Sequence, residues 1–269
     1  MLSELDRTKF QEDGYVVWRD VLSPAEVDEL MAEADRVVDW AVRSSRERGA
    51  WNPRMDVAAD DAGRQIVRSI SPMLDLSPKI ARLTEDSRFR GRARALLGSD
   101  VVLIDEKLNT KTIIEADCGP PNVGSGGWTP HQDWGYLRPT GCPDAGATFV
   151  IPLDEARGRG PIVLYPGSHL QPPAYADADP AHGNGRVDLK KMKLPQRKEI
   201  TEPPGSVVAF DFRMIHQSKP NRSLKPRRLF IIAYASTDAG ATAETRRRWQ
   251  LQRSSAAARF ETRIPEAAL

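Results

Sequence analysis

The chain has 269 residues, of which 40% are hydrophobic and 28% are charged, an ordinary composition for a globular protein. Its 39 basic residues against 37 acidic ones give a formal net charge of +2, so the charge balance does not indicate nucleic-acid binding. No apolar run approaches membrane-spanning length and the N-terminus has no signal pattern, so we expect a soluble, cytoplasmic protein without a membrane partner. Cys118 and Cys142 are too few for a disulfide scaffold and should be reduced.

The first hundred residues are predicted to be mostly helical. Residues 5–13 should form a helix, and residues 15–18 a short strand after a glycine break. A serine N-cap at Ser23, a proline at the first helical position and Glu26 at the capping-box position then open a helix that should reach about Val42. Two shorter helices are expected at residues 77–83 and 87–98, after an irregular stretch that ends in an extended segment at 65–70.

Residues 101–114 alternate in the manner of a β-strand. Lys107, Asn109 and Lys111 share one face of this strand. An amide between two cations is unusual on a solvated face but suits a site that holds a dicarboxylate. All three residues, Lys107, Asn109 and Lys111, are therefore candidates for binding such a ligand.

The later part of the chain contains short strands separated by loops. Buried strands are predicted at residues 148–153, 162–165, 207–212 and 228–234. The loop at 118–127, rich in glycine and proline, should form a flap beside the substrate space. Residues 171–200 are polar, and the family resemblance described below implies that they occupy the place of a substrate lid. Their basic run at 190–198 is either a solvated face or a sign of an acidic substrate. Residues 237–269 should form a short amphipathic helix or a disordered tail.

The strongest sign of chemistry is the triplet His131-Gln132-Asp133. On a strand, residues i and i+2 point to the same face, so His131 and Asp133 would converge while Gln132 faces away. An imidazole nitrogen and a carboxylate oxygen suit a divalent ion, and a second histidine would complete the 2-His-1-carboxylate triad of non-haem iron sites.

Three further histidines compete for that third position. His216 follows the buried strand at 207–212, so its ring would be held rigidly at a cavity mouth. His182 lies in a loop of glycine and proline that has nothing to position an imidazole, and His169 is a turn residue that could bind the backbone instead. His216 is therefore the predicted third ligand.

Three segments of the chain together resemble the phytanoyl-CoA dioxygenase superfamily of Fe(II)/2-oxoglutarate oxygenases over roughly residues 5–234. They are His131-x-Asp133, the run from Gly160 to His169, and the pattern His216-x-Ser218-x-x-Asn221-x-Ser223-x-x-x-Arg227. The resemblance implies that His131, Asp133 and His216 carry the iron, and that Arg227, assisted by Ser218, binds the distal carboxylate of 2-oxoglutarate. It further implies that Asn109 lines the cofactor pocket, that Phe149 abuts 2-oxoglutarate, and that His169 has a structural role in its turn.

Many short strands, with metal ligands expected on two of them, indicate a mainly β protein built as a jelly roll or barrel rather than from βαβ units. The resemblance narrows this expectation to a cupin-like double-stranded β-helix with helices packed on one side. We expect a single domain over 1–269, with a helical part at about 1–100, a β-helix core at about 101–236 and a tail at 237–269.

The resemblance implies an enzyme that uses Fe(II), 2-oxoglutarate and dioxygen to hydroxylate an unactivated C–H bond of a small molecule, with release of succinate and carbon dioxide. The ligand Asp133 argues against halogenation. Desaturation, cyclisation and epimerisation remain alternatives, as do a metal-dependent cupin-like enzyme that uses no 2-oxoglutarate and a non-enzymatic ligand-binding barrel. An acyl-CoA substrate is less expected, because the run at 190–198 is the only basic cluster available to bind it. No feature of the sequence specifies an oligomeric state.

Overall fold

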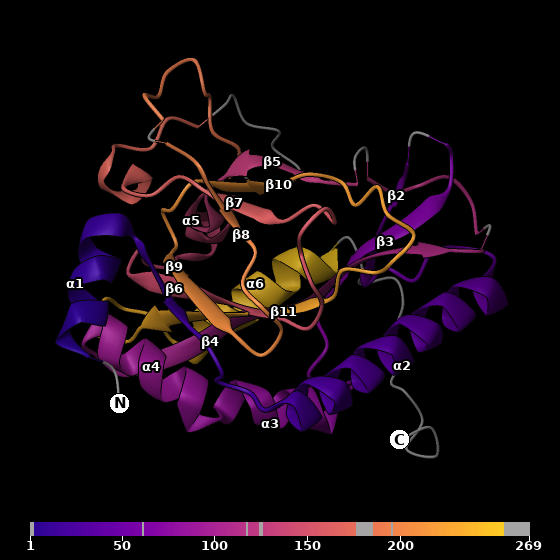
Figure 1. Cartoon of the computed structure of the whole chain (residues 1–269), viewed down its shortest axis with the longest axis horizontal. Coiled ribbons are helices and arrows are strands. Elements are labelled where there is room, and N and C mark those ends of the chain that lie inside the picture. Colours follow the sequence, from indigo (N-terminus) through magenta and orange to yellow (C-terminus); the bar gives the residue numbers. More distant parts are fainter. Residues whose placement is uncertain are drawn as a thin grey trace.

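The computed structural model describes residues 3–60, 62–116, 118–123, 126–175, 185–194 and 196–255. In these residues two antiparallel sheets face each other (Figure 1). The large sheet contains β1 (Tyr15–Trp18), β2 (Met55–Ala59), β3 (Gln65–Ile70), β4 (Val101–Ile114), β6 (Gly146–Pro152), β9 (Val207–Asp211) and β11 (Leu229–Ser236). The small sheet contains β5 (Trp128–His131), β7 (Ile162–Leu164), β8 (Lys198–Ile200) and β10 (His216–Ser218).

The order of strands is β1-β9-β6-β11-β4-β3-β2 in the large sheet and β5-β10-β7-β8 in the small one. Strands far apart in the sequence are neighbours, as where β11 pairs with both β4 and β6. Two facing antiparallel sheets with such crossovers form the jelly roll that the sequence predicted.

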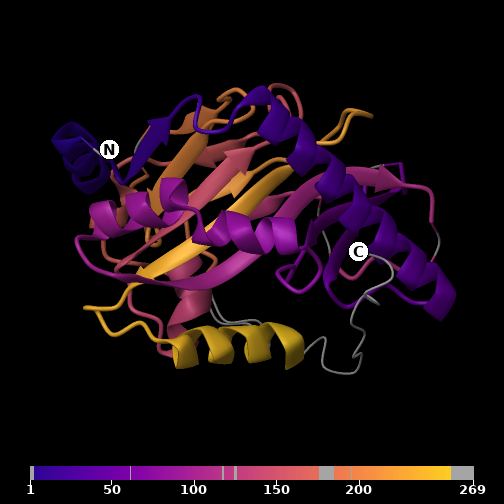
Figure 2. The ribbon, with the colours of Figure 1, turned by 90° about the horizontal axis from the view of Figure 1, so that it is seen from below.

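Helices cover the outer face of the large sheet. They are α1 (Glu4–Asp13), α2 (Pro24–Arg48), α3 (Pro78–Glu85) and α4 (Ser87–Leu97), while α5 (Asp133–Leu137), α6 (Ala243–Ser255) and two 3₁₀ turns, η1 (Arg138–Thr140) and η2 (Ser168–Leu170), lie elsewhere. Figure 2 shows α2, α3 and α4 across one face of the sheet and α6 apart from them. The helices are therefore packed on one side, as expected.

Alternation along β11 explains why the sheet is buried on both faces. Phe230, Ile232 and Tyr234 belong to the core beneath the helices. Leu229 and Ile231 belong to a second core between the two sheets. Since side chains alternate across a strand, consecutive apolar residues fill both cores.

Helix α2 begins as predicted but ends later. The Ser23 hydroxyl accepts a hydrogen bond from the backbone of Glu26, and the Glu26 carboxylate accepts one from the backbone of Ser23. The helix passes the predicted end at Val42 and stops at Arg48, where Gly49 adopts a left-handed conformation with φ of 65°. Glycine accepts this conformation at little cost, and it supplies the stop.

The region before residue 100 contains the expected helices and one strand, β2, that the sequence pattern did not predict. It supplies β1, β2 and β3 to the large sheet, and β2 lies in residues that the sequence pattern marked as irregular. Pairing with β3 along its whole length stabilises β2, which has no strong strand pattern of its own. Because strands from both parts of the chain share one sheet, we propose that they form a single domain.

Two expectations about bulk properties can be compared with the fold. Cys118 and Cys142 are both free and buried, as expected. Of the helices in the described residues, none combines the length and the apolar character that crossing a membrane requires.

Candidate active site

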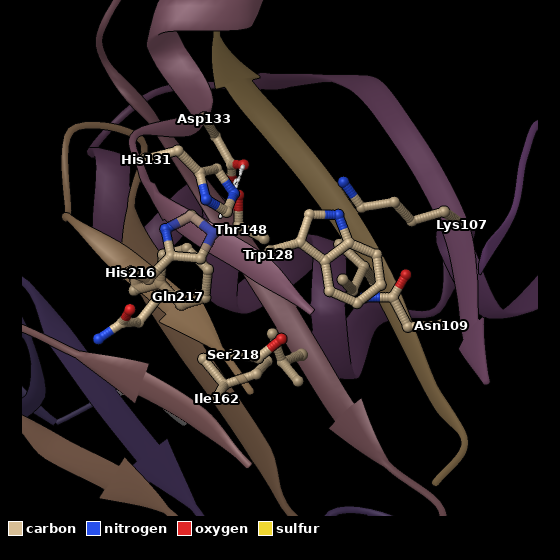
Figure 3. A pocket seen from close by; sticks show the side chains of 13 residues that line it. Lys107, Asn109, Trp128, His131, Asp133, Thr148, Ile162, His216, Gln217 and Ser218 are labelled. Atoms are coloured by element: carbon tan, nitrogen blue, oxygen red, sulfur yellow. Dashed lines mark hydrogen bonds and ion pairs between the residues drawn. The ribbon is translucent and has the colours of Figure 1, made fainter. Parts of the chain in front are cut away.

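Three side chains converge between the two sheets. The Nε2 atoms of His131 and His216 lie 4.0 and 3.7 Å from Oδ1 of Asp133, and the two ring centroids are 4.1 Å apart. One ligand atom from each residue lies within 4.8 Å of the others. Figure 3 shows the two imidazoles side by side, with the carboxylate next to them. The predicted ligands are thus brought together by the fold.

The backbone places these residues differently from the prediction. Strand β5 ends at His131, Gln132 precedes the helix, and Asp133 is the first residue of α5. The buried amide of Gln132 donates a hydrogen bond to the carbonyl of Arg213, which holds the chain where it leaves the strand. The assumption that His131 and Asp133 share one strand was therefore wrong. His216 begins β10 and pairs directly with His131 across the small sheet.

Hydrogen bonds fix which nitrogen of each ring is free. Nδ1–H of His131 donates to the carbonyl of Thr129 at 2.7 Å, and Nδ1–H of His216 donates to the carbonyl of Met214 at 3.1 Å. Burial, aided by the neighbouring His216, lowers the pKa of His131 to about 3, and burial also lowers the pKa of His216. Both rings are therefore neutral at neutral pH and present an Nε2 lone pair, the form that binds a metal.

The carboxylate is oriented by a neighbouring hydroxyl. Oγ1 of Thr148 donates to Oδ2 of Asp133 at 2.6 Å, which leaves Oδ1 facing the histidines. Burial tends to raise the pKa of Asp133, but the nearby His216 and Lys107 lower it overall, so the group is ionised. Two neutral imidazoles and one carboxylate form the donor set of a non-haem iron site.

Thr148→Val should weaken metal binding while preserving the shape of the side chain. Loss of the hydrogen bond to Asp133 frees the carboxylate to rotate, and we expect iron affinity to fall about 10- to 100-fold. Competition with a metal-binding dye measures this affinity. In the control Thr140→Val, the hydroxyl that is lost donates to the carbonyl of Leu137, so metal affinity should be unchanged. Equal affinities in wild type and Thr148→Val would contradict the role of Thr148.

A cavity of about 410 Å³ opens beside the three ligands. Asn109 and Ser218 lie in its wall away from the metal cluster (Figure 3). Oδ1 of Asn109 is buried and has no hydrogen-bond partner among the described residues. The full lining is Lys107, Asn109, Trp128, His131, Asp133, Thr148, Val150, Ile162, Phe210, His216, Gln217, Ser218 and Ile231.

Arg227 lies beside the part of β4 that carries Asn109, although it is not among the residues that line the cavity. Its backbone N–H donates to the carbonyl of Thr110 on β4, and its side chain is only 1% exposed. None of its three guanidinium nitrogens has a hydrogen-bond partner among the described residues, whereas the guanidinium of Arg228 is paired with Asp154 and Asp35. Burial lowers the pKa of Arg227 to about 10, so the group remains charged at neutral pH. A buried and unpaired cation is costly, which indicates that an anion belongs there.

Phe149, which the resemblance implies abuts 2-oxoglutarate, is not among the residues that line this cavity. Its ring lies in the core beneath the helices, 6.0 Å from Trp18 and 5.6 Å from Tyr234 between ring centroids. The residues on either side of it, Thr148 and Val150, face the cavity instead. The difference of one residue reverses the face because side chains alternate along β6.

The remaining histidines lie outside the metal cluster or outside the described residues. Nε2 of the buried His169 lies 3.0 Å from the carbonyl of Gln11, in agreement with a structural role in its turn. His182 is not among the described residues. The predicted lid is described only at 171–175, 185–194 and 196–200, and residues 198–200 of it form β8 of the small sheet.

The aromatic residues around the triplet divide between walls and packing. Trp128 lines the cavity described above. Trp134 is a packing residue, since its Nε1–H donates to the carbonyl of Cys142 at 3.2 Å. Tyr136 instead lines a neighbouring cavity.

The sequence patterns did not predict this second cavity, which has a volume of about 330 Å³. It shares Asp133, Lys107, Thr148 and Ile231 with the first, and Asp105, Tyr136, Leu137, Ala233 and Trp249 complete its wall. Trp249 belongs to α6, in the segment expected to be a short helix or a tail. The one sequence feature that pointed to this cavity was a single tryptophan in an otherwise polar segment. That this tryptophan packs near β4 is seen only in the fold.

Comparison with known proteins supports both fold and chemistry. A family model described as phytanoyl-CoA dioxygenase matches residues 10–229. The ectoine dioxygenase of Bordetella bronchiseptica is 27% identical over 243 residues, or 85% of this chain and 74% of that protein. The corresponding enzyme of Halomonas elongata is 24% identical over 253 residues, or 88% and 71% of the two chains.

Two solved structures are similar to the chain as a whole. The epimerase SnoN in complex with Fe3+, alpha ketoglutarate and nogalamycin RO has a TM-score of 0.66 at 24% identity and covers 87% of this chain and 83% of its own. EctD from S. alaskensis with 2-oxoglutarate and 5-hydroxyectoine has a TM-score of 0.66 at 22% identity, with coverage of 88% and 77%. These similarities confirm the predicted double-stranded β-helix.

Proposed function

The chain belongs to the phytanoyl-CoA dioxygenase family and is a non-haem Fe(II)- and 2-oxoglutarate-dependent oxygenase, and we propose that it hydroxylates a C–H bond of a small molecule. In this proposal His131, Asp133 and His216 hold the iron. Arg227, Ser218 and Asn109 hold 2-oxoglutarate.

The observation that carries the proposal is the buried guanidinium of Arg227, whose nitrogens have no hydrogen-bond partner among the described residues. Its planar fork matches a carboxylate in two parallel hydrogen bonds. Ser218 and Asn109 line the same cavity as the metal ligands, and the backbone of Arg227 is hydrogen-bonded to Thr110, the residue after Asn109. In the proposal a dicarboxylate therefore extends from the metal towards this cation. A metal-only cupin enzyme would have no use for this arrangement.

When bound, iron and 2-oxoglutarate together activate dioxygen, and this chemistry belongs to the cofactors rather than to the protein. The protein contributes the positions and orientations of the groups that hold the cofactors. Thr148 and the backbone carbonyls of Thr129 and Met214 hold the three ligands in fixed orientations. Burial of the ligands keeps bulk water from the reaction.

The second cavity is the proposed substrate space. It adjoins Asp133 but lies away from Asn109 and Ser218, so a molecule in it would reach the metal from a side that 2-oxoglutarate does not need. Leu137, Ala233 and Trp249 give it an apolar wall, and Asp105 adds a carboxylate. A small molecule with an apolar body and a polar group fits this lining.

Hydroxylation is proposed as the outcome, since the carboxylate ligand that halogenases lack is present as Asp133. The likeness to an ectoine dioxygenase and to an epimerase is compatible with two outcomes of the same chemistry. Product analysis separates them, because hydroxylation adds one oxygen atom to the substrate whereas epimerisation leaves its mass unchanged.

The proposal is tested by adding Fe(II) and then 2-oxoglutarate to the metal-free protein without oxygen. The expected result is a weak visible charge-transfer band that appears only when both are present. Oxygen and a panel of small metabolites are then added, and succinate is measured. Iron binding without the band would reject 2-oxoglutarate as cosubstrate and would favour a metal-only enzyme.

Trp249→Ala should raise KM for the substrate by about 10-fold or more, because the loss of a large aromatic wall removes apolar contact area. The affinity for 2-oxoglutarate should not change, since Trp249 does not line the first cavity. Steady-state kinetics on a substrate found in the panel measure both constants. Leu251→Ala, on the exposed side of the same helix, is the control that should alter neither. An unchanged KM in Trp249→Ala would place the substrate elsewhere.

A further inference from the structure

The second cavity carries an ion pair on a wall that is otherwise mostly apolar. Nζ of Lys107 lies 3.4 Å from Oδ2 of Asp105, and both residues line this cavity. The side chain of Asp105 is 9% exposed and that of Lys107 is 24% exposed, so bulk water reaches the pair only in part. Charges in such a place are costly unless groups of opposite charge lie beside them. The pair therefore differs from a surface salt bridge, and a ligand in this cavity would lie against it.

A bulge in β4 places the carboxylate on the cavity face. The pairing of β4 with β11 passes directly from Leu103 to Asp105 and leaves Ile104 as an extra residue. Leu103 faces the core beneath the helices, and in a regular strand Asp105 would face that core too. The extra residue puts Asp105 on the same face as Lys107 and Asn109 instead. Bulges are frequent beside active sites, where they re-aim a side chain.

Lys107 connects this ion pair with the metal cluster. It lines both cavities, and Figure 3 shows it on the same wall of the first cavity as Asn109. Asp133, one of the three metal ligands in our proposal, also lines both cavities. A molecule that contacts the ion pair would therefore lie beside the metal cluster, where a substrate must lie in order to react.

The two charged groups are not in their closest possible contact. Their separation of 3.4 Å exceeds the roughly 2.7–2.9 Å of a charge-assisted hydrogen bond, whereas Arg228 and Asp154 lie 2.8 Å apart. A ligand with a single charge would meet a like charge in one member of the pair, which is unfavourable. A ligand with both charges can pair with each member, so the wall is complementary to a zwitterion.

We propose that the substrate is a zwitterion of the amino-acid type, whose ammonium group pairs with Asp105 and whose carboxylate pairs with Lys107. The inference rests on the proposed function and adds the chemical class of the substrate to it. Each charge of the ligand meets one member of the internal pair, so no charge is left unpaired when the cavity is filled. The apolar part of the molecule lies against Trp249 and Leu137.

The alternative is that Asp105 and Lys107 only stabilise β4 as neighbours on one face of the strand. A purely structural pair would change the stability of the protein when it is broken. It would not determine which charges a ligand must carry.

The test is calorimetric titration of the common amino acids into protein loaded with Mn(II) and 2-oxoglutarate, which needs no turnover. For each amino acid that binds, the analogue without the ammonium group and the analogue without the carboxylate are titrated in the same way. We expect at least one amino acid to bind, and both of its analogues to bind about 10-fold more weakly or worse.

Asp105→Asn should reverse part of this preference. We expect affinity for the amino acid to fall about 10- to 100-fold, while the analogue without the ammonium group binds at least as well as to wild type. Affinity for 2-oxoglutarate should not change, because Asp105 does not line the first cavity. The matched control is Glu106→Gln, since the carboxylate of Glu106 accepts a hydrogen bond from the backbone of Met73 and lines neither cavity. This control should keep the ligand preference of wild type.

Each outcome has a distinct meaning. If 2-oxoglutarate binds to wild type but no amino acid does, the inference fails and the proposed function stands. If 2-oxoglutarate does not bind, both fail. If the analogues bind wild type as tightly as the amino acid, or if Asp105→Asn leaves the preference unchanged, the ion pair is structural and the inference is wrong. Should Asp105→Asn not fold, as judged by its thermal unfolding, the comparison of the three ligands on wild type still decides.

Discussion

Arg227→Met is expected to reduce 2-oxoglutarate affinity by more than about 100-fold, equivalent to about 3 kcal/mol. The guanidinium is fully buried without a partner among the described residues, so it would form the main ion pair to the distal carboxylate. Anaerobic titration of the charge-transfer band measures the affinity. Arg227→Lys should recover only part of the loss, because an ammonium cannot make the two parallel hydrogen bonds.

The same substitution should have an unusual effect on stability. Without ligand, Arg227→Met removes an unpaired buried charge and keeps most of the side-chain volume, so the free energy of unfolding should not fall and can rise. The adjacent Arg228→Gln is the matched control: it breaks the pairs with Asp154 and Asp35, lowers stability by about 1 to 3 kcal/mol and leaves 2-oxoglutarate binding intact. The reverse pattern, with Arg228 needed for binding and Arg227 for stability, would overturn our assignment.

Replacing His216 by alanine is expected to abolish oxygenase activity and to lower iron affinity by at least about 100-fold. One of three protein ligands is lost, and the remaining two come from β5 and α5. Iron content after anaerobic loading and desalting measures the effect directly. The 2-oxoglutarate charge-transfer band should disappear with the metal.

The control for His216→Ala is His169→Asn. His169 is equally buried, but Nε2 of its ring contacts the carbonyl of Gln11 and not the metal cluster. This variant should lose stability and still bind iron with wild-type affinity. If His216→Ala retained iron and His169→Asn lost it, the assignment of His216 as the third ligand would be wrong.

Much of the candidate site could be predicted from local sequence patterns. The spacing of His131 and Asp133 and the strand before His216 were enough to select, from four histidines and many carboxylates, the three residues that the fold brings together as candidate metal ligands. The selection of these residues did not depend on whether Asp133 lies on a strand or a helix. It therefore remained the same although Asp133 was predicted on a strand and lies at the start of α5. Asn109 was found from alternation along β4, and it lies in the cavity wall.

Other features could not be predicted because they depend on a shift of one residue or on a distant partner. Phe149 faces the helices, whereas Thr148 faces the cavity. The face on which each side chain lies depends on how β6 is placed between the two cores. Arg68 is largely buried, with its guanidinium carbon 4.6 Å from the centre of the Trp128 ring, although its strand pattern did not decide between a surface and a cavity position. The chain near Gly127, which accepts a hydrogen bond from Arg68, brings these residues together from separate parts of the sequence.

The sequence by itself determined the elements and the chemistry: hydrophobic period, caps and glycine stops specify helices and strands, and short spacing specifies the metal ligands. The tertiary structure decided which cavity each side chain enters. Trp249 lines the second cavity because α6 packs near β4, and Lys111 is buried where the register of β3 against β4 shifts. The physical reason is that local interactions fix backbone conformation, whereas the packing of strands and helices far apart in the chain selects the face on which a side chain is buried.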